Sequence, residues 1–348
     1  MASNSKSVLV AMSGGVDSSV AAALLTKSGC DVTGAYLSFG ASGRAADAAA
    51  SARRVAEKLG IELVVLDFAD AFASIIEDFA AEYARGRTPN PCIHCNARIK
   101  FGRLIEQAEA MGIQYVATGH HARLIDSAGR PAVARGRARQ KDQSYALFAV
   151  AREHLCRILL PTGEVDNKSR VRKIAQSLGL DSHDRPDSQE ICFVADNDYV
   201  SLLQKRVPQA LQPGDIVNAA GEVLGRHDGY GRFTVGQRRG LGVAAGEPLY
   251  VTRIDAATAT VTIGPKAEVM GRHLSASGAN WHCDVPASKV FEATVQVRYN
   301  HGGAPGRVKV TAPDTFEVDF ADDVSAITPG QAAVIYDGDT LLGGGWID

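Results

Sequence analysis

The sequence predicts an α/β fold in which a doubly wound parallel sheet is followed by two small β modules, the last of them a β-barrel. Through roughly the first 120 residues, short β-rich runs alternate with amphipathic helical stretches, which is the pattern of right-handed βαβ units. After about Ser201, glycine and proline become frequent and the β runs become short and alternating, as in antiparallel modules. With 348 residues the chain is long enough for several domains, and we expect them at 1–205, 206–267 and 268–348.

Four strands and four helices are expected in the first domain. The predicted strands are Ser7–Met12, Val32–Ser38, Glu62–Asp67 and Tyr115–Thr118. The predicted helices are Ser18–Lys27, Ala46–Leu59, Ala71–Tyr83 and Asn96–Met111. Gly29 follows the first helix and suits its C-terminal cap, because glycine readily adopts the left-handed conformation required there. Ligands of such sheets bind beyond the carboxyl ends of the strands, so functional residues are expected at those ends.

Short alternating runs predict antiparallel strands in the other two modules. Those of the central module are Leu249–Ile254 and Thr260–Ile263. Those of the last module are Ala293–Arg298, Arg307–Thr311, Thr315–Phe320 and Ala332–Tyr336.

Composition excludes several classes of protein. Apolar residues make up 45% of the chain and charged residues 22%, an ordinary globular balance. No apolar run approaches the roughly 20 residues that cross a bilayer, and the first residues lack the features of a secretory signal. Six cysteines in a chain of this length are too few for a disulfide scaffold. We therefore expect a soluble cytoplasmic protein without a membrane partner.

The net charge of −2 conceals an asymmetry along the chain. Between Arg123 and Lys173 there are twelve basic and five acidic residues, whereas Lys266–Asp348 contains six basic and eleven acidic residues. A basic block of this kind suits a polyanionic partner, and Arg135, Arg137 and Arg139 are candidate phosphate contacts. The alternative is an ordinary set of solvated helix and hairpin faces.

A glycine-rich turn joins the first predicted strand to the first helix. Its sequence, Ser13–Ser19, reads SGGVDSS. Paired glycines let the backbone approach an anion, and the serine hydroxyls and the helix N-terminus suit a phosphate or pyrophosphate. Because no lysine follows as in a Walker loop, and no GxGxxG is present, those two nucleotide-binding classes are disfavoured. The alternative is a serine-capped βα turn with no ligand.

Two cysteine segments carry the next signal. Cys95 lies in TPNPCIHCN, a loop that Pro89 and Pro91 are expected to keep extended, directly before the predicted helix at Asn96. A helix N-terminus is expected to lower the pKa of the Cys95 thiol. Cys192 lies in DSQEICF. Asp187 and Ser188 of that segment are expected to support Cys192 or only to shape a turn, whereas Cys30, Cys156 and Cys283 are expected to be buried.

Six segments in order, SGGVDSS, TPNPCIHCN, ATGHHAR, KDQSYALF, DSQEICF and GQRRGLG, closely resemble the bacterial tRNA-specific 2-thiouridylase family. The resemblance extends to the C-terminal VRYN and PGQAAVIY. It implies an adenine-nucleotide hydrolase-like first domain with an ATP pyrophosphatase loop. It also implies that ATP, with Mg²⁺, adenylates O2 of the wobble uridine in the tRNA anticodon stem-loop, and that sulfur then attacks C2 to give 2-thiouridine, AMP and pyrophosphate.

The resemblance also implies a role for each matching residue. Cys192 would receive a persulfide from a sulfur carrier or cysteine desulfurase, Cys95 would be the second catalytic thiol, and the two would form a disulfide. The implied ATP-binding residues are Ala11, Met12, Ser13, Gly14, Gly15, Val16, Asp17, Ser18, Leu37 and Gly119, with Asp17 placed to hold Mg²⁺. The implied tRNA contacts are Asn90, Pro91, Cys92, His120, Lys141, Asp142, Gln143, Arg298, Tyr299 and Gln331.

Cys92 departs from much of the family, in which an aspartate follows TPNP. The resulting CxxC, together with Cys192, could supply three ligands to a 4Fe-4S cluster whose open iron holds a hydrosulfide. The competing hypothesis is persulfide chemistry with Cys92 as a spectator.

Two other functions are also compatible with the glycine-rich turn. An amidating or ligating adenylase, such as a tRNA lysidine, argininosuccinate or GMP synthetase, would remain active when Cys95 or Cys192 is replaced by serine. A non-enzymatic nucleotide-binding module would release no pyrophosphate when ATP and tRNA are added.

Overall fold

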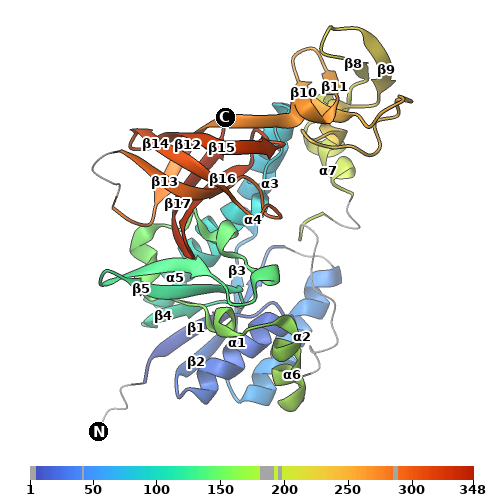
Figure 1. The fold of residues 1–348 in the computed structure, drawn as a ribbon. Coiled ribbons are helices and arrows are strands. Elements are labelled where there is room, and N and C mark those ends of the chain that lie inside the picture. The colour runs from blue at the N-terminus through green and yellow to red at the C-terminus, as the bar shows by residue number, and fades with distance from the viewer. Residues whose placement is uncertain (1–4, 41–42, 181–191, 195–197, 285–288) are drawn as a thin grey trace.

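The computed structural model describes residues 5–40, 43–180, 192–194, 198–284 and 289–348, without the side chains of residues 43–45. A parallel five-stranded sheet forms the N-terminal part, in the order β3-β2-β1-β4-β7. Its strands are β1 Ser7–Ala11, β2 Asp31–Ser38, β3 Glu62–Asp67, β4 Tyr115–Ala117 and β7 Ile158–Leu159. The predicted α/β class and the doubly wound order are confirmed (Figure 1).

Helices cover both faces of this sheet because its strands are apolar on both sides. Val8 and Val10 of β1 pack among the helices on one face, whereas Leu9 between them packs against the helix that contains Leu104 on the other. The α-helices of this part are α1 Val16–Lys27, α2 Gly43–Leu59, α3 Ala69–Ala84, α4 Pro91–His94, α5 Leu104–Ala110 and α6 Lys168–Ser177. Gly29 follows α1 with φ +83°, as its expected capping role requires.

The helix that was expected to begin at Asn96 begins earlier, at Pro91. The Asn90 side chain accepts a hydrogen bond from the Cys92 N–H at 3.2 Å, and Pro91 occupies the first helical position, where no N–H is needed. A π-helical segment, η1 Cys95–Arg103, then connects α4 to α5. The expectation of an extended loop up to Cys95 was therefore wrong, and Cys95 lies inside a continuous helical run.

Short 3₁₀ turns connect many of these elements. They are η2 Arg139–Lys141, η3 Ser144–Leu147, η4 Arg152–Arg157, η5 Pro161–Glu164, η8 Pro208–Leu211, η9 Tyr230–Arg232 and η10 Lys266–Val269. Helix α7 Tyr199–Arg206 leads into the central module, whose sheet has the order β10-β11-β8-β9. Its strands are β8 Gly214–Val217, β9 Val223–His227, β10 Tyr250–Asp255 and β11 Thr260–Gly264.

The C-terminal part is a closed six-stranded antiparallel barrel. Its strands are β12 Met270–Trp281, β13 Val290–Gln296, β14 Ala304–Ala312, β15 Thr315–Ser325, β16 Ala332–Asp337 and β17 Thr340–Ile347. The four strands expected from the sequence are present, and pairing between β12 and β17, which were not expected, closes the barrel.

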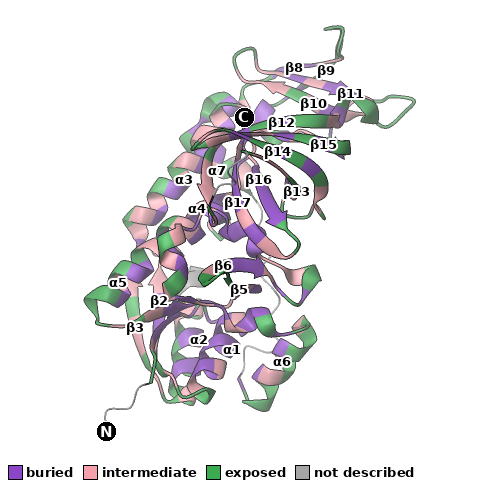
Figure 2. Ribbon diagram, turned by 60° about the vertical axis from the view of Figure 1, so that its left-hand side comes forward, coloured by how far each residue is buried: buried purple, intermediate pink, exposed green. Residues whose placement is uncertain are grey.

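The barrel and the parallel-sheet domain are joined by a hairpin. Its strands, β5 Ala122–Ser127 and β6 Arg130–Arg135, pair with each other, and Ala134 of β6 pairs with Thr340 of β17. Tyr145 and Tyr336 belong to one buried cluster that spans both parts. Figure 2 shows buried residues along β16 and β17, the barrel strands that meet the hairpin. Across the described ranges, no helix is both long and apolar enough to span a membrane.

Candidate active site

The glycine-rich turn lies at the carboxyl end of β1, the central strand of the sheet. Gly14 has φ +74°, and a Cβ there would lie 2.7 Å from the Ala48 carbonyl oxygen, so this position requires glycine. The Ser51 hydroxyl donates to the Gly14 carbonyl at 3.1 Å and fixes the turn against α2.

The serine hydroxyls of the turn mostly bond to the turn itself. Ser18 Oγ accepts a hydrogen bond from the Ser13 N–H at 3.2 Å and donates to the Gly15 carbonyl at 3.1 Å. Ser19 Oγ donates to the same carbonyl at 2.8 Å. These hydroxyls, which were expected to bind phosphate, therefore shape the turn, and the exposed Ser13 is the serine that faces solvent.

The other residues expected to bind ATP surround this turn. Met12 and Val16 are buried on either side of it, while Ala11 ends β1 and Leu37 is half-buried in β2. Gly119 follows β4, and a Cβ there would lie 2.5 Å from Ser18 N. The close approach of this segment to the first turn of α1 therefore explains the glycine at position 119.

Asp17 makes the strongest polar contacts of the turn. Lys168 Nζ donates to its two carboxylate oxygens at 2.6 and 2.5 Å, and His121 Nε2 bonds to it at 2.9 Å. Burial alone would raise the pKa of Asp17, but the hydrogen bonds and charges of His121 and Lys168 outweigh burial and lower the pKa. The carboxylate therefore remains ionised. Sequence reasoning missed Lys168, since nothing local links position 168 to position 17.

His120, the next residue after Gly119, is buried rather than displayed. Its Nδ1 lies 2.7 Å from Thr118 Oγ1, and the Thr162 hydroxyl donates to its carbonyl oxygen at 2.9 Å. Burial, followed by the positive charge of Lys100, holds the pKa of His120 well below its ordinary value. The imidazole is therefore neutral, and it offers little surface to a tRNA.

The cysteine pair of α4 and η1 has one exposed and one buried member. Cys92 is exposed, whereas Cys95 is 7% exposed and packs in a cluster with Phe72 of α3. Phe193, the neighbour of Cys192, packs edge-on against the same Phe72 ring at 5.6 Å. Phe72 of α3 thus packs near both Cys95 and the residue next to Cys192.

Both candidate thiols are protonated at neutral pH. Burial, with a contribution from the charge of Cys92, raises the pKa of Cys95. Cys192 is exposed at its surface. Desolvation of its thiol by the surrounding protein, followed by the charges of Cys95 and Cys92, nevertheless raises its pKa to about 12. The expectation that a helix N-terminus lowers the pKa of Cys95 was wrong, because Cys95 is in the interior of a helical run.

We expect the alkylation rate of Cys192 to keep rising with pH well beyond the range in which an ordinary thiol levels off. Only the thiolate reacts, so its rate increases about tenfold per pH unit until the pKa is reached. Quantitative mass spectrometry of iodoacetamide-treated protein measures this, with the exposed Cys156 as the internal control. A plateau of the Cys192 rate near pH 8.5 would contradict the raised pKa.

Among the described residues, no group of three histidine, cysteine or acidic side chains is arranged to hold a metal ion. Cys92, Cys95 and Cys192 are all described, so their present arrangement does not form the expected three-thiol metal site. Cys156 is exposed and Cys30 and Cys283 are half-buried, so the expectation of burial was wrong for Cys156. Asp187 and Ser188 lie outside the described residues.

Residues 141–143, which we call the KDQ segment, are held in place by hydrogen bonds and an ion pair to the end of the β5–β6 hairpin. Asp142 accepts hydrogen bonds from the Gly136 N–H at 2.8 Å and the Ser144 hydroxyl at 2.8 Å, and pairs with Arg135. Gln143 bonds to both backbone groups of His121. Lys141 is half-buried beside them. This segment therefore connects the turn around Asp17 to the barrel.

Of the three barrel residues expected to contact tRNA, Tyr299 and Gln331 approach the cysteine segment, whereas Arg298 bonds within the barrel. Tyr299 is 42% exposed, and burial followed by the charges of Asp142 and Cys92 raises its pKa. Gln331 Nε2 donates to the Thr88 carbonyl at 2.6 Å, just before Asn90. Arg298 donates to the Ser325 carbonyl. The exposed Tyr299 ring is thus the member of this set that is free to stack on a base.

Part of the basic block forms ion pairs with an acidic residue of the barrel. Asp339 of the barrel pairs with Arg123 at 2.9 Å and also with Arg139. Arg135 lies 3.8 Å from the centre of the Tyr336 ring. Much of the basic block thus holds the two parts of the protein together.

The fold and site define a nucleotide-using enzyme with paired thiols. The family models "tRNA methyl transferase HUP domain", "tRNA methyl transferase PRC-barrel domain" and "Aminomethyltransferase beta-barrel domain" match residues 6–196, 200–265 and 271–347. The chain is 46% identical to the tRNA-specific 2-thiouridylase MnmA of Geotalea uraniireducens, with 99% of this chain and 95% of the relative covered. It is 45% identical to that of Carboxydothermus hydrogenoformans, over 99% and 98%.

The chain belongs to the tRNA-specific 2-thiouridylase family. It is a tRNA sulfurtransferase that uses ATP and forms 2-thiouridine in tRNA.

Proposed function

We propose that the enzyme modifies the wobble uridine of the anticodon by adenylating O2 and then delivering sulfur to C2. The packing of Cys95 and of Phe193, the neighbour of Cys192, around Phe72 supports this proposal most directly. Tyr299, whose pKa is raised by burial and then by the charges of both Asp142 and Cys92, and the KDQ segment are the groups that would receive the anticodon loop. Bases of such loops are single-stranded and can be turned out onto an aromatic ring.

The ATP would lie on the turn between β1 and α1, with its phosphates at the N-terminus of α1. The backbone of Gly14 and Gly15 permits close approach, and Lys168 adds positive charge beside the phosphates. A Mg²⁺ ion commonly takes one or two carboxylates together with phosphate oxygens, and the ionised Asp17 fits that donor set. When bound, such an ion would neutralise phosphate charge during loss of pyrophosphate.

Sulfur transfer would begin with a persulfide on Cys192, supplied by a carrier or cysteine desulfurase. The terminal sulfur attacks C2, a carbon–sulfur bond forms and AMP leaves. The Cys95 sulfur then attacks Sγ of Cys192, the persulfide S–S bond breaks, and its electron pair remains on the sulfur that becomes the thiocarbonyl. The products are 2-thiouridine and a Cys95–Cys192 disulfide, so each cycle requires a reductant. We place this chemistry in the cytoplasm.

Cys92→Ser is expected to leave thiolation near the wild-type rate with a persulfide donor, because Cys92 takes no part in this route. Thiolated nucleosides and protein-bound iron are both measured after anaerobic reconstitution, with Cys156→Ser as the matched control. Loss of iron together with loss of activity in Cys92→Ser alone would overturn the persulfide route in favour of a 4Fe-4S cluster.

A further inference from the structure

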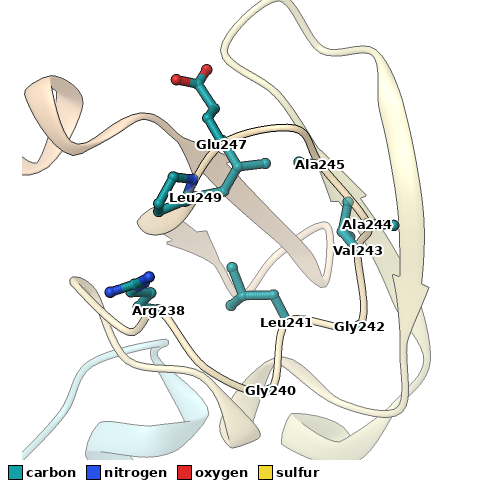
Figure 3. Close-up of a pocket in the computed structure, with 10 residues that line it drawn as sticks. Arg238, Gly240, Leu241, Gly242, Val243, Ala244, Ala245, Glu247 and Leu249 are labelled. Carbon is teal, nitrogen blue, oxygen red and sulfur yellow. The ribbon is translucent and has the colours of Figure 1, made fainter.

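The segment between η9 and β10 has a rigid base. The Gly236 N–H donates to the Val251 carbonyl at 2.8 Å, and the Val251 N–H donates to the Gln237 carbonyl at 2.9 Å. The Gln237 side chain accepts from the Thr234 N–H at 3.0 Å and donates to the Arg239 carbonyl at 3.0 Å. Residues 238–249, which follow, form an irregular loop that we call the arginine loop (Figure 3).

This base lies where the three parts of the protein meet. The Thr88 hydroxyl donates to Thr234 Oγ1 at 3.3 Å, which connects the loop to the segment that carries Cys92. The Thr328 hydroxyl donates to the Val235 carbonyl at 3.4 Å and connects it to the barrel. Thr88 itself bonds to Gln331, which is expected to contact tRNA. The arginine loop therefore begins a few residues from the groups that would receive the substrate.

Arg238 and Arg239 are exposed, and neither forms an ion pair or hydrogen bond through its guanidinium within the described part of the chain. The arginines of the basic block differ in this respect: Arg135 is paired with Asp142 and Arg137 with Glu164. Unpaired guanidinium groups are the donors that phosphate oxygens require.

The backbone N–H groups of the arginine loop are also available to a ligand. Within the described residues, the N–H groups of 238–247 form no hydrogen bond, and Gly240 and Gly242 have φ of +75° and +70°. The loop encloses an open hollow of about 490 Å³, with Arg238 on one side and Leu241 directed inward (Figure 3). Glu247 is the one acidic residue that lines it. Free N–H groups and arginines around a hollow suit a sugar-phosphate chain.

We propose that the arginine loop binds backbone phosphates of the tRNA arm that carries the target uridine. The base of the loop bonds to the cysteine segment, so the loop would lie beside the arm that presents the target uridine. The choice of the anticodon arm therefore rests on the proposed wobble position. Each lysine or arginine that neutralises a phosphate contributes about 0.9 to the slope of log K against log salt, which is roughly fivefold in affinity at 0.15 M salt.

The test compares Arg238→Gln/Arg239→Gln with Arg53→Gln/Arg54→Gln, an adjacent exposed pair on α2 with the same change of charge. Binding of labelled full-length tRNA and of an isolated anticodon stem-loop is measured by fluorescence anisotropy across a salt series. The loop variant is expected to bind both RNAs about 30-fold more weakly at 0.15 M salt, with the slope reduced by about 1.8. ATP affinity and the thermal midpoint are expected to stay unchanged.

Affinity and slope equal to those of the control variant would overturn the inference while leaving the enzyme's function intact. A loss seen with full-length tRNA but absent with the stem-loop would overturn the assignment to the target arm. Wild-type protein that binds full-length tRNA but not the stem-loop would instead count against the proposed wobble position.

Discussion

Replacement of Cys95 by serine is expected to abolish 2-thiouridine formation, whereas about one equivalent of pyrophosphate per enzyme is still released in the presence of tRNA. Serine occupies nearly the same volume, so the cluster around Phe72 is preserved and only the second thiol is lost. Without it, the sulfur bonded to C2 cannot be released from Cys192. Mass spectrometry of tRNA nucleosides and a coupled pyrophosphate assay measure the two steps separately.

Cys156→Ser is the matched control for this experiment because Cys156 is exposed and lies in η4, far along the chain from both candidate thiols. It should retain both steps. Full thiolation by Cys95→Ser would exclude Cys95 as the thiol that releases the sulfur.

Asp17→Ala is expected to lower the rate of pyrophosphate release by about 100-fold or more, as is typical when a positioned electrostatic group beside a reacting phosphate is removed. The carboxylate holds Lys168 through two short contacts and is kept ionised by Lys168 and His121. Its removal eliminates the candidate Mg²⁺ ligand and releases the lysine from the turn. Steady-state release of pyrophosphate with saturating tRNA is the measurement.

Asp166→Ala provides the control, since Asp166 is an exposed acid near Lys168 whose pairing with Arg170 contributes little in water. It should leave the rate within about twofold of wild type. A wild-type rate in Asp17→Ala would show that the carboxylate serves only the shape of the turn.

Four of the five strands of the parallel sheet could be predicted closely, because each is a short apolar run between helical patterns, whereas the two-residue β7 was not expected. Predicted Glu62–Asp67 coincides with β3. Strand β17 could not be predicted in this way, because Gly343–Gly345 give it the appearance of a turn. In the barrel, a Cβ at Gly343 would lie 2.6 Å from the Asn280 carbonyl oxygen. Glycine is required there because β12, more than 60 residues away in the sequence, packs closely against this strand. Local sequence patterns do not contain that information.

At the site, the glycine turn and both cysteine segments could be identified from sequence motifs. The protonation state of the cysteines and the ion-pair partners of the site could not be predicted from the sequence. The pKa of Cys95 depends on where the helix begins, and Asn90 and Pro91 begin it one turn earlier than expected. Lys168 and Asp339 act on residues far from them in the sequence, so only the folded chain shows their partners.

The pairing of Ala134 with Thr340 sets the order in which the protein can be completed. The hairpin strand β6 is synthesised about two hundred residues before the strand on which it docks, so the cost in loop-closure entropy is high and the contact order is long. Until β16 and β17 are synthesised, the cluster around Tyr145 lacks its barrel members, among them Ala332, Tyr336 and Leu341. We therefore infer that, through most of its synthesis, the nascent chain exposes the apolar side of the N-terminal part on which the barrel later packs. A chaperone would be needed during that interval.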